Sequence, residues 1–132
     1  MSAIAGIYYL DGRPVAVNCL AGMLERLAHR GPNGTGSWVQ GSMGLGHRML
    51  WSTPESMGEH LPLEDNAAGL VITADARIDN RDELIETLGM ARRGAAPITD
   101  SEIILATYEK WGEKCPTKLI GDFAFAIWGC GS

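Results

Sequence analysis

Two strand-forming stretches of this sequence, residues 37–40 and 43–50, are joined by only Gly41-Ser42, which limits the possible folds severely. So short a link closes only an antiparallel hairpin. Further apolar runs of strand length predict three more strands. They occupy residues 4–10, 69–74 and 120–128. The chain should therefore contain at least five strands, two of which are neighbours in one sheet.

Helical periodicity and capping signals predict three helices. The first should begin near Asn18, the expected N-cap, because apolar residues recur at helical spacing from Leu20 to Leu27. The Asn80–Glu83 and Thr99–Glu102 pairs have the capping-box spacing and predict two further helix starts. Loops are expected over 29–36 and 52–68. Because strands and helices do not alternate regularly, an α+β fold in a single domain, 1–132, is predicted.

Charge and composition exclude several classes of partner. The chain of 132 residues has 11 basic and 16 acidic side chains and a net charge of −5, without a basic run to follow a phosphate backbone or an anionic membrane. No apolar run approaches the roughly 20 residues that cross a bilayer, and the N-terminus lacks a basic signal-peptide region. We therefore expect a cytoplasmic protein that binds neither nucleic acid nor membrane.

The cysteines and histidines give no metal-binding or disulfide pattern. The three cysteines lack paired short spacing, as is usual for reduced thiols, and the three histidines have no partner at metal-ligand spacing. These residues are Cys19, Cys115, Cys130, His29, His47 and His60. No metal site is expected in this chain.

Five segments in fixed order resemble the N-terminal domain of asparagine synthetases, a class II glutamine amidotransferase domain. The segments are Ile4-Ala5-Gly6-Ile7-Tyr8, Ala28-His29-Arg30-Gly31-Pro32-Asn33-Gly34, Gly44-Leu45-Gly46-His47-Arg48, Thr99-Asp100-Ser101-Glu102 and Phe123-Ala124-Phe125-Ala126-Ile127-Trp128. The resemblance implies a four-layer αββα N-terminal-nucleophile hydrolase sandwich, here expected to lack its last strands. It also implies that ATP and magnesium belong to a synthetase domain outside this chain, with no cofactor in these residues.

The resemblance places Ser2 where active members of the family have their nucleophile, a Cys whose own α-amine serves as base. Removal of Met1 would expose the α-amine of Ser2. A hydroxyl activated by an amine is a known covalent catalyst, but it is a weaker nucleophile than a thiol with a partly populated thiolate. Ser2 is therefore expected to be a degenerate nucleophile position.

Two further family positions are replaced. Met49 stands where the family has the Arg that binds the glutamine α-carboxylate, and Arg48 should point to the opposite face of its strand. Asp75 and Ala76 stand where the family has the Asn-Gly pair of the oxyanion hole. A carboxylate there repels the developing negative charge. Asp75 and Arg77 should share a strand face and could form an ion pair.

Asp100 matches the aspartate with which the family holds the glutamine α-amino group. An acidic residue in the first turn of a helix is also favoured by the helix dipole, so this position has a structural explanation as well. Arg30 with Gly31-Pro32 is expected to fix the loop after the first helix.

Three readings of function follow from these replacements. The first is a glutamine amidotransferase-like scaffold, without glutaminase activity, in an ATP-dependent amide ligase that takes its amine from the substrate. Thr53-Pro54-Glu55-Ser56 and residues 73–80 look most similar to the lasso-peptide cyclases, which share this chemistry with the β-lactam synthetases. The second is an amidohydrolase with Ser2 as working nucleophile. The third is a stand-alone binding module that self-associates through an exposed sheet edge. The expected partner is a synthetase domain, a partner protein or a second copy of the chain.

Overall fold

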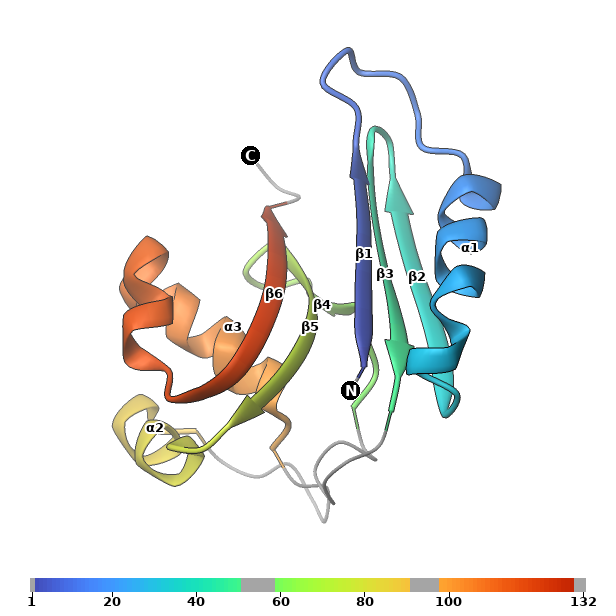
Figure 1. Cartoon of the computed structure of the whole chain (residues 1–132). Helices are drawn as coiled ribbons and strands as arrows, with labels where there is room; N and C mark the ends of the chain where they lie inside the picture. Colours follow the sequence, from blue (N-terminus) through green and yellow to red (C-terminus); the bar gives the residue numbers. More distant parts are fainter. Residues whose placement is uncertain (1, 51–58, 91–97, 130–132) are drawn as a thin grey trace.

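The computed structural model describes residues 2–50, 59–90 and 98–129. Two antiparallel sheets face each other, and helices cover their outer sides (Figure 1). Helix α1 (Val17–Arg26) lies outside one sheet, while α2 (Arg81–Leu88) and α3 (Asp100–Trp111) lie on the outer side of the other. The predicted αββα layering is confirmed.

The first sheet has the order β1-β3-β2 and contains the predicted hairpin. Its strands are β1 (Ala3–Tyr8), β2 (Gly34–Gln40) and β3 (Met43–Met49). Strand β2 begins three residues before the predicted start, inside the segment expected to be a loop. Both pairings are antiparallel, and Ala3 of β1 and Thr35 of β2 lie opposite Arg48 of β3. This register brings the beginning of β1 to the end of β3.

Helix α1 packs on strand β3 through positions that lack side chains. Leu24 is buried on the helix, and a Cβ added at Gly46 would lie 2.8 Å from its methyl carbons. The predicted cap is wrong, because the N-cap is Ala16, with extended backbone, and Asn18 already lies in the first turn. A short 3₁₀ helix, η1 (Ala28–Arg30), follows α1.

The second sheet has the order β4-β5-β6. Strand β5 (Leu70–Ile78) continues beyond the predicted 69–74, and β6 (Gly121–Gly129) agrees with the predicted last strand. Strand β4 (Leu63–Asp65) lies inside the stretch 52–68 that was expected to be a loop, of which 52–58 falls outside the described residues. Its three residues carry no recognisable strand pattern, and pairing with β5 forms the strand.

One predicted capping box forms and the other does not. At α3 the Thr99 hydroxyl accepts a hydrogen bond from the Glu102 N–H, and the Glu102 carboxylate accepts from Thr99 N–H. Asn80 precedes α2 without capping it. Its side chain instead donates to Lys118 O at 3.0 Å and accepts from Ile120 N at 2.9 Å. Asn80 thereby ties the start of α2 to the end of the 3₁₀ helix η3 (Gly112–Lys118).

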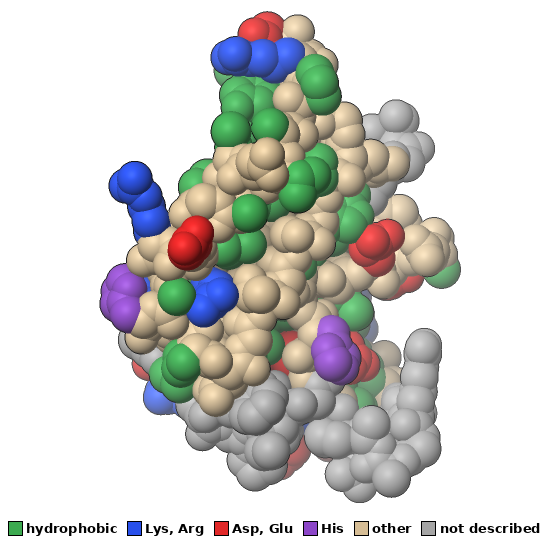
Figure 2. Space-filling view, turned by 90° about the vertical axis from the view of Figure 1, so that its right-hand side faces the viewer, with side chains coloured by type: hydrophobic (Ala, Val, Ile, Leu, Met, Phe, Trp, Pro, Cys, Tyr) green, Lys and Arg blue, Asp and Glu red, His purple; other side chains and the backbone are tan. Residues whose placement is uncertain are grey.

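The main core lies between the second sheet and α3, and extends toward the first sheet. Its fully buried members include Ile72, Ile103 and Ile104. Met49 belongs to the same cluster, although it comes from the first sheet. Figure 2, which looks onto the α1 side, shows hydrophobic side chains in small groups between polar and charged ones. Among the described residues, no helix is long and apolar enough to cross a membrane.

Candidate functional site

Ser2 lies at the start of β1, against the end of β3. The Leu50 N–H donates to its Oγ at 2.9 Å, and the Met49 Sδ atom lies 3.8 Å from the same oxygen. Only 8% of Ser2 is exposed. The Ser2 hydroxyl thus extends the pairing of β1 and β3 by one hydrogen bond beyond the strands. Its neighbours are the Leu50 backbone N–H and the Met49 thioether.

Met49 and Arg48 lie on opposite faces of β3, as predicted. Met49 is buried in the core between the sheets. Arg48 lies on the other face, where a Cβ added at Gly31 would overlap its backbone and Cβ. The absence of a side chain at Gly31 therefore allows the turn after η1 to approach Arg48 closely, directly after Arg30. Arg48 does not take the place of the Arg that the family has at the next position.

Asp75 lies in β5 and faces the first sheet. Burial raises the pKa of its carboxyl group, while the positive charge of Arg30 and a hydrogen bond from the Ser2 backbone N–H act in the opposite direction. Ser2, Met49 and Asp75 are therefore brought together, as the resemblance implies. Ala76 points to the other side of β5 and packs against the core.

The predicted Asp75–Arg77 ion pair is wrong. Arg77 pairs instead with Asp79 at 3.1 Å and with Asp122 at 3.2 Å. Asp122 is its direct cross-strand partner on β6, and both side chains are exposed. Asp75 interacts with Ser2 at the start of β1. Arg77 therefore pairs with the two carboxylates at the exposed end of the second sheet.

Asp100, the first residue of α3, is engaged by groups of the protein itself. Its Oδ2 accepts from Ile78 N at 3.3 Å, and its Oδ1 forms an ion pair with Arg81. The second guanidinium nitrogen of Arg81 donates to Ile98 O. Both side chains of the ion pair are largely buried. Sequence reasoning missed Arg81, because nothing local links the first residue of α2 to the first residue of α3.

Glu59 was also missed, since it falls in a segment predicted to be a loop. Its carboxylate accepts a hydrogen bond from Ser101 N at 2.9 Å, in the first turn of α3. Burial is the main influence on this group and raises the pKa of the Glu59 carboxyl. The N-terminus of α3 thus has the carboxylates of Glu59, Asp100 and Glu102 close to it.

His47 connects the two sheets. Its Nδ1 lies 3.4 Å from Thr73 Oγ1 on β5, and this hydroxyl donates to Gly46 O at 3.1 Å. The side chain is 2% exposed, and burial lowers its pKa to about 4, so the ring is neutral at pH 7. Its Nε2 has no hydrogen-bond partner among the described residues.

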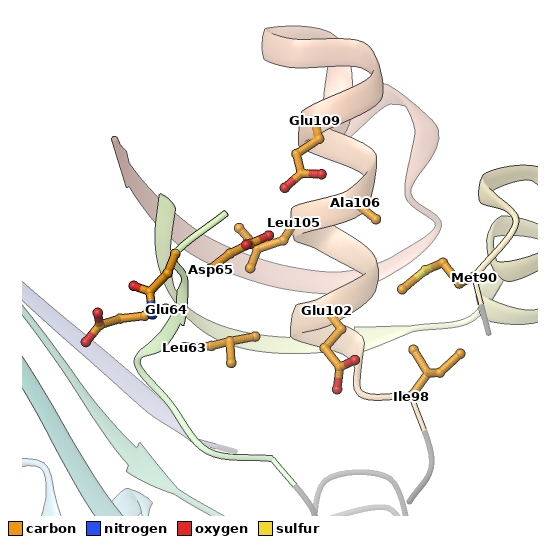
Figure 3. Close-up of a pocket in the computed structure, with 10 residues that line it drawn as sticks. Leu63, Glu64, Asp65, Met90, Ile98, Glu102, Leu105, Ala106 and Glu109 are labelled. Atoms are coloured by element: carbon orange, nitrogen blue, oxygen red, sulfur yellow. The ribbon is translucent and has the colours of Figure 1, made fainter. Parts of the chain in front are cut away.

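Two cavities lie near these elements. The larger, about 580 Å³, opens between β4 and α3, and its side chains include the carboxylates of Glu64, Asp65, Glu102 and Glu109 (Figure 3). It contains none of the family's site positions. The smaller, about 370 Å³, lies between β2, the end of β3 and the segment 59–62. It includes Met49 and His47, and so adjoins the site.

Taken together, the geometry brings Ser2, Met49 and Asp75, three positions that the resemblance assigns to the family's site, into one region. Asp75 contributes a carboxylate to this region, and Met49 contributes a thioether. Among the described residues, no group of His, Cys, Asp and Glu side chains is placed to hold a metal ion.

Comparison with known proteins identifies the family of this domain. The family described as "Glutamine amidotransferase domain" matches residues 1–131. Asparagine synthetase [glutamine-hydrolyzing] 1 of Bacillus subtilis is 34% identical over 107 residues, which cover 80% of this chain and 17% of that protein. Asparagine synthetase [glutamine-hydrolyzing] 2 of Oryza sativa is 32% identical over 103 residues, which cover 78% of this chain and 17% of that protein. The chain thus spans about a sixth of the length of these relatives.

A solved structure shows the same fold. Glutamine phosphoribosylpyrophosphate amidotransferase of Bacillus subtilis superposes with a TM-score of 0.71 at 20% identity, over 98% of this chain and 35% of that one. The two facing sheets with helices on their outer sides are the fold of an amidotransferase domain. The chain belongs to the glutamine amidotransferase domain family. The segment Thr53-Pro54-Glu55-Ser56, which suggested the cyclase type, lies outside the described residues.

Proposed function

We propose that this domain does not hydrolyse glutamine and instead serves as the scaffold of an asparagine-synthetase-like, ATP-dependent amide ligase. The observation that carries the proposal is the ion pair between Arg81 and Asp100. Asp100 is the one polar anchor for glutamine that the chain retains. Its carboxylate is neutralised by Arg81 and also accepts a hydrogen bond from the backbone of Ile78. A glutamine ammonium group would have to displace the guanidinium from a largely buried position.

The surroundings of Ser2 support the same proposal. In active members of the family the α-amine of the first residue accepts a proton from the nucleophile. If Ser2 is the first residue, its α-amine lies beside the Asp75 carboxylate, which accepts a hydrogen bond from the Ser2 backbone N–H in this structure. A neighbouring negative charge stabilises the ammonium form, which cannot act as a base. Asp75 thus opposes both the activation of the nucleophile and the stabilisation of an oxyanion.

The proposed ligase chemistry resides elsewhere. The relatives that this chain matches are longer asparagine synthetases, of which the matched residues cover 17%. We propose that a synthetase domain, fused or separate, binds ATP and magnesium, activates a carboxylate and uses an amine of the substrate. The present domain then contributes a rigid surface beside that site, as in a lasso-peptide cyclase or a β-lactam synthetase.

The test is labelling with 6-diazo-5-oxo-norleucine, a glutamine analogue that alkylates the family's nucleophile, followed by intact mass and peptide mapping. The wild-type protein should remain unlabelled, like the Ser2→Ala control. Restoring the family residues by Ser2→Cys, Met49→Arg, Asp75→Asn and Ala76→Gly should give labelling only when Arg81→Gln is added, because Asp100 is then available. Labelling of wild-type Ser2 would refute the scaffold proposal and establish the N-terminal serine amidohydrolase.

A further inference from the structure

The cavity of about 580 Å³ between β4 and α3 has an apolar floor. Leu63 from β4 and Leu105 from α3 lie in the space between the two elements (Figure 3). Leu105 and Ile98 belong to the main core, and Leu63 and Met90 pack against it. The cavity thus leaves one edge of the core open, and an apolar side chain of a ligand placed there would be removed from water.

Two carboxylates that line the cavity, Asp65 on β4 and Glu109 on α3, lie close to each other. Burial raises the pKa of the Glu109 carboxyl, and the hydrogen bond and negative charge of the neighbouring Asp65 raise it further. Glu109 is exposed and Asp65 is half-buried, so a ligand that enters the cavity can reach both groups. Adjacent like charges repel each other, and a cation that contacts both would be stabilised.

The described part of the protein does not supply this cation. The described residues that line the cavity include no Lys or Arg, and Glu64 and Glu102 add further negative charge. Of the ion pairs between described side chains, none involves Asp65 or Glu109. The carboxylates are also not arranged as a metal site, as far as the described residues show. An organic cation therefore fits this cavity better than an anion or a metal ion.

Arginine is the natural cation that matches two neighbouring carboxylates best. Its guanidinium group is planar and carries five N–H donors in a fixed fork, so one group can donate to both carboxylates, whereas Lys presents a single point charge. The cavity volume of about 580 Å³ lies in the range of sites that hold several ligand groups. An apolar side chain next to the arginine can therefore lie on the floor of the cavity. A peptide segment supplies both side chains in a fixed order.

We infer that this cavity docks a peptide segment of another protein or domain, in which an arginine contacts Asp65 and Glu109 and an adjacent apolar side chain lies on the apolar floor. Charge complementarity selects the arginine, and the open edge of the core selects its neighbour. The cavity contains none of the family's site positions. The inference is therefore independent of whether the domain hydrolyses glutamine.

The experiment is a titration of the ¹⁵N-labelled protein with short peptides, followed by ¹H–¹⁵N NMR at low salt, where charge pairs are least screened. The probe is acetyl-leucyl-arginyl-leucinamide. Its matched control has citrulline, which has the shape of arginine without the charge. The arginine peptide should shift amide signals of β4 and α3 saturably at millimolar concentration, and the citrulline peptide should bind at least about tenfold more weakly. Replacing both leucines of the peptide with glycine should also weaken binding, because the apolar floor then stays in contact with water.

Glu109→Gln tests the contribution of the carboxylate pair. The position is exposed and the amide has the size of the carboxylate, so the fold should persist while the affinity for the arginine peptide falls about tenfold. Glu113→Gln removes the same charge at an exposed position on η3 outside the cavity. This matched control should bind like wild type.

Equal affinity for the arginine and citrulline peptides, an unchanged affinity in Glu109→Gln, or no saturable shift would each overturn the proposal. The sequence also has Arg92 and Arg93, which lie outside the described residues. Binding of the arginine peptide only after Arg92→Gln and Arg93→Gln would assign the cavity to arginines of the same chain, and would likewise overturn the proposal.

Discussion

His47 should make the stability of this domain depend on pH in a predictable direction. Burial lowers the pKa of the folded ring from 6.5 to about 4. The unfolded chain therefore binds the proton first as pH falls, and the stabilisation present above about pH 6.5 is lost toward about pH 4. At about 1.4 kcal/mol per pH unit, the full loss is about 3 kcal/mol, of which about 2 kcal/mol is lost by about pH 5.

Replacing His47 with Gln removes this titration, so the comparison isolates it. The carboxyls of Glu59 and Asp75, whose pKa values are raised, contribute the opposite slope, but they are present in both proteins. Urea unfolding of both proteins at about pH 7.5 and about pH 5 gives four free energies of unfolding. We expect wild type to lose about 2 kcal/mol more than His47→Gln. Equal losses in the two proteins would show that the buried ring is not held neutral.

Two further predictions concern backbone geometry and thiol chemistry. Gly121→Ala should destabilise the domain by at least about 2 kcal/mol, because φ is +145° and a Cβ would lie 2.0 Å from Arg77 O. Gly129→Ala is the control, since a Cβ there meets nothing within 4 Å, and similar midpoints in urea for both variants would contradict the argument. Cys19 is exposed and should react readily with iodoacetamide, whereas burial raises the pKa of Cys115 to about 11 and should leave it unmodified until the protein unfolds. Mass spectrometry of native and denatured samples distinguishes the two sites, and rapid native labelling of Cys115 would count against a closed core.

Local pattern predicted most of the secondary structure because the elements carry their own signals. The hairpin at Gly41-Ser42 and the capping box at Thr99 depend on residues that are neighbours in sequence, and both form as expected. Asn80 shows the limit of such reasoning. Its side chain hydrogen-bonds to the backbone of Lys118 and Ile120, about 40 positions away, instead of capping α2. Strand β4 was missed for the same reason, since its conformation depends on β5 rather than on its own three residues.

The candidate site also combines features that the sequence predicted with contacts that only the fold creates. The positions of Ser2, Met49 and Asp75 followed from the family resemblance, and the fold brings them together. The ion pair of Asp100 with Arg81 could not be predicted from the sequence. The two residues are separated in sequence and meet only when α2 and α3 pack. The contact between His47 and Thr73 likewise arises only when one sheet lies on the other. These long-range pairs form only in the folded chain and have no local signal in the sequence.

The two sheets use separate parts of the chain, and this has a consequence for synthesis. The first sheet lies within residues 3–49 and the second within 63–129. A ribosome therefore completes the first sheet and α1 before it makes β5, at a rate of about 5–20 residues per second. During an interval on the order of seconds, the inner side chains Leu45, His47 and Met49 have no opposing sheet. The nascent chain thus presents an uncovered inner face to chaperones or to another nascent chain until Thr73 arrives.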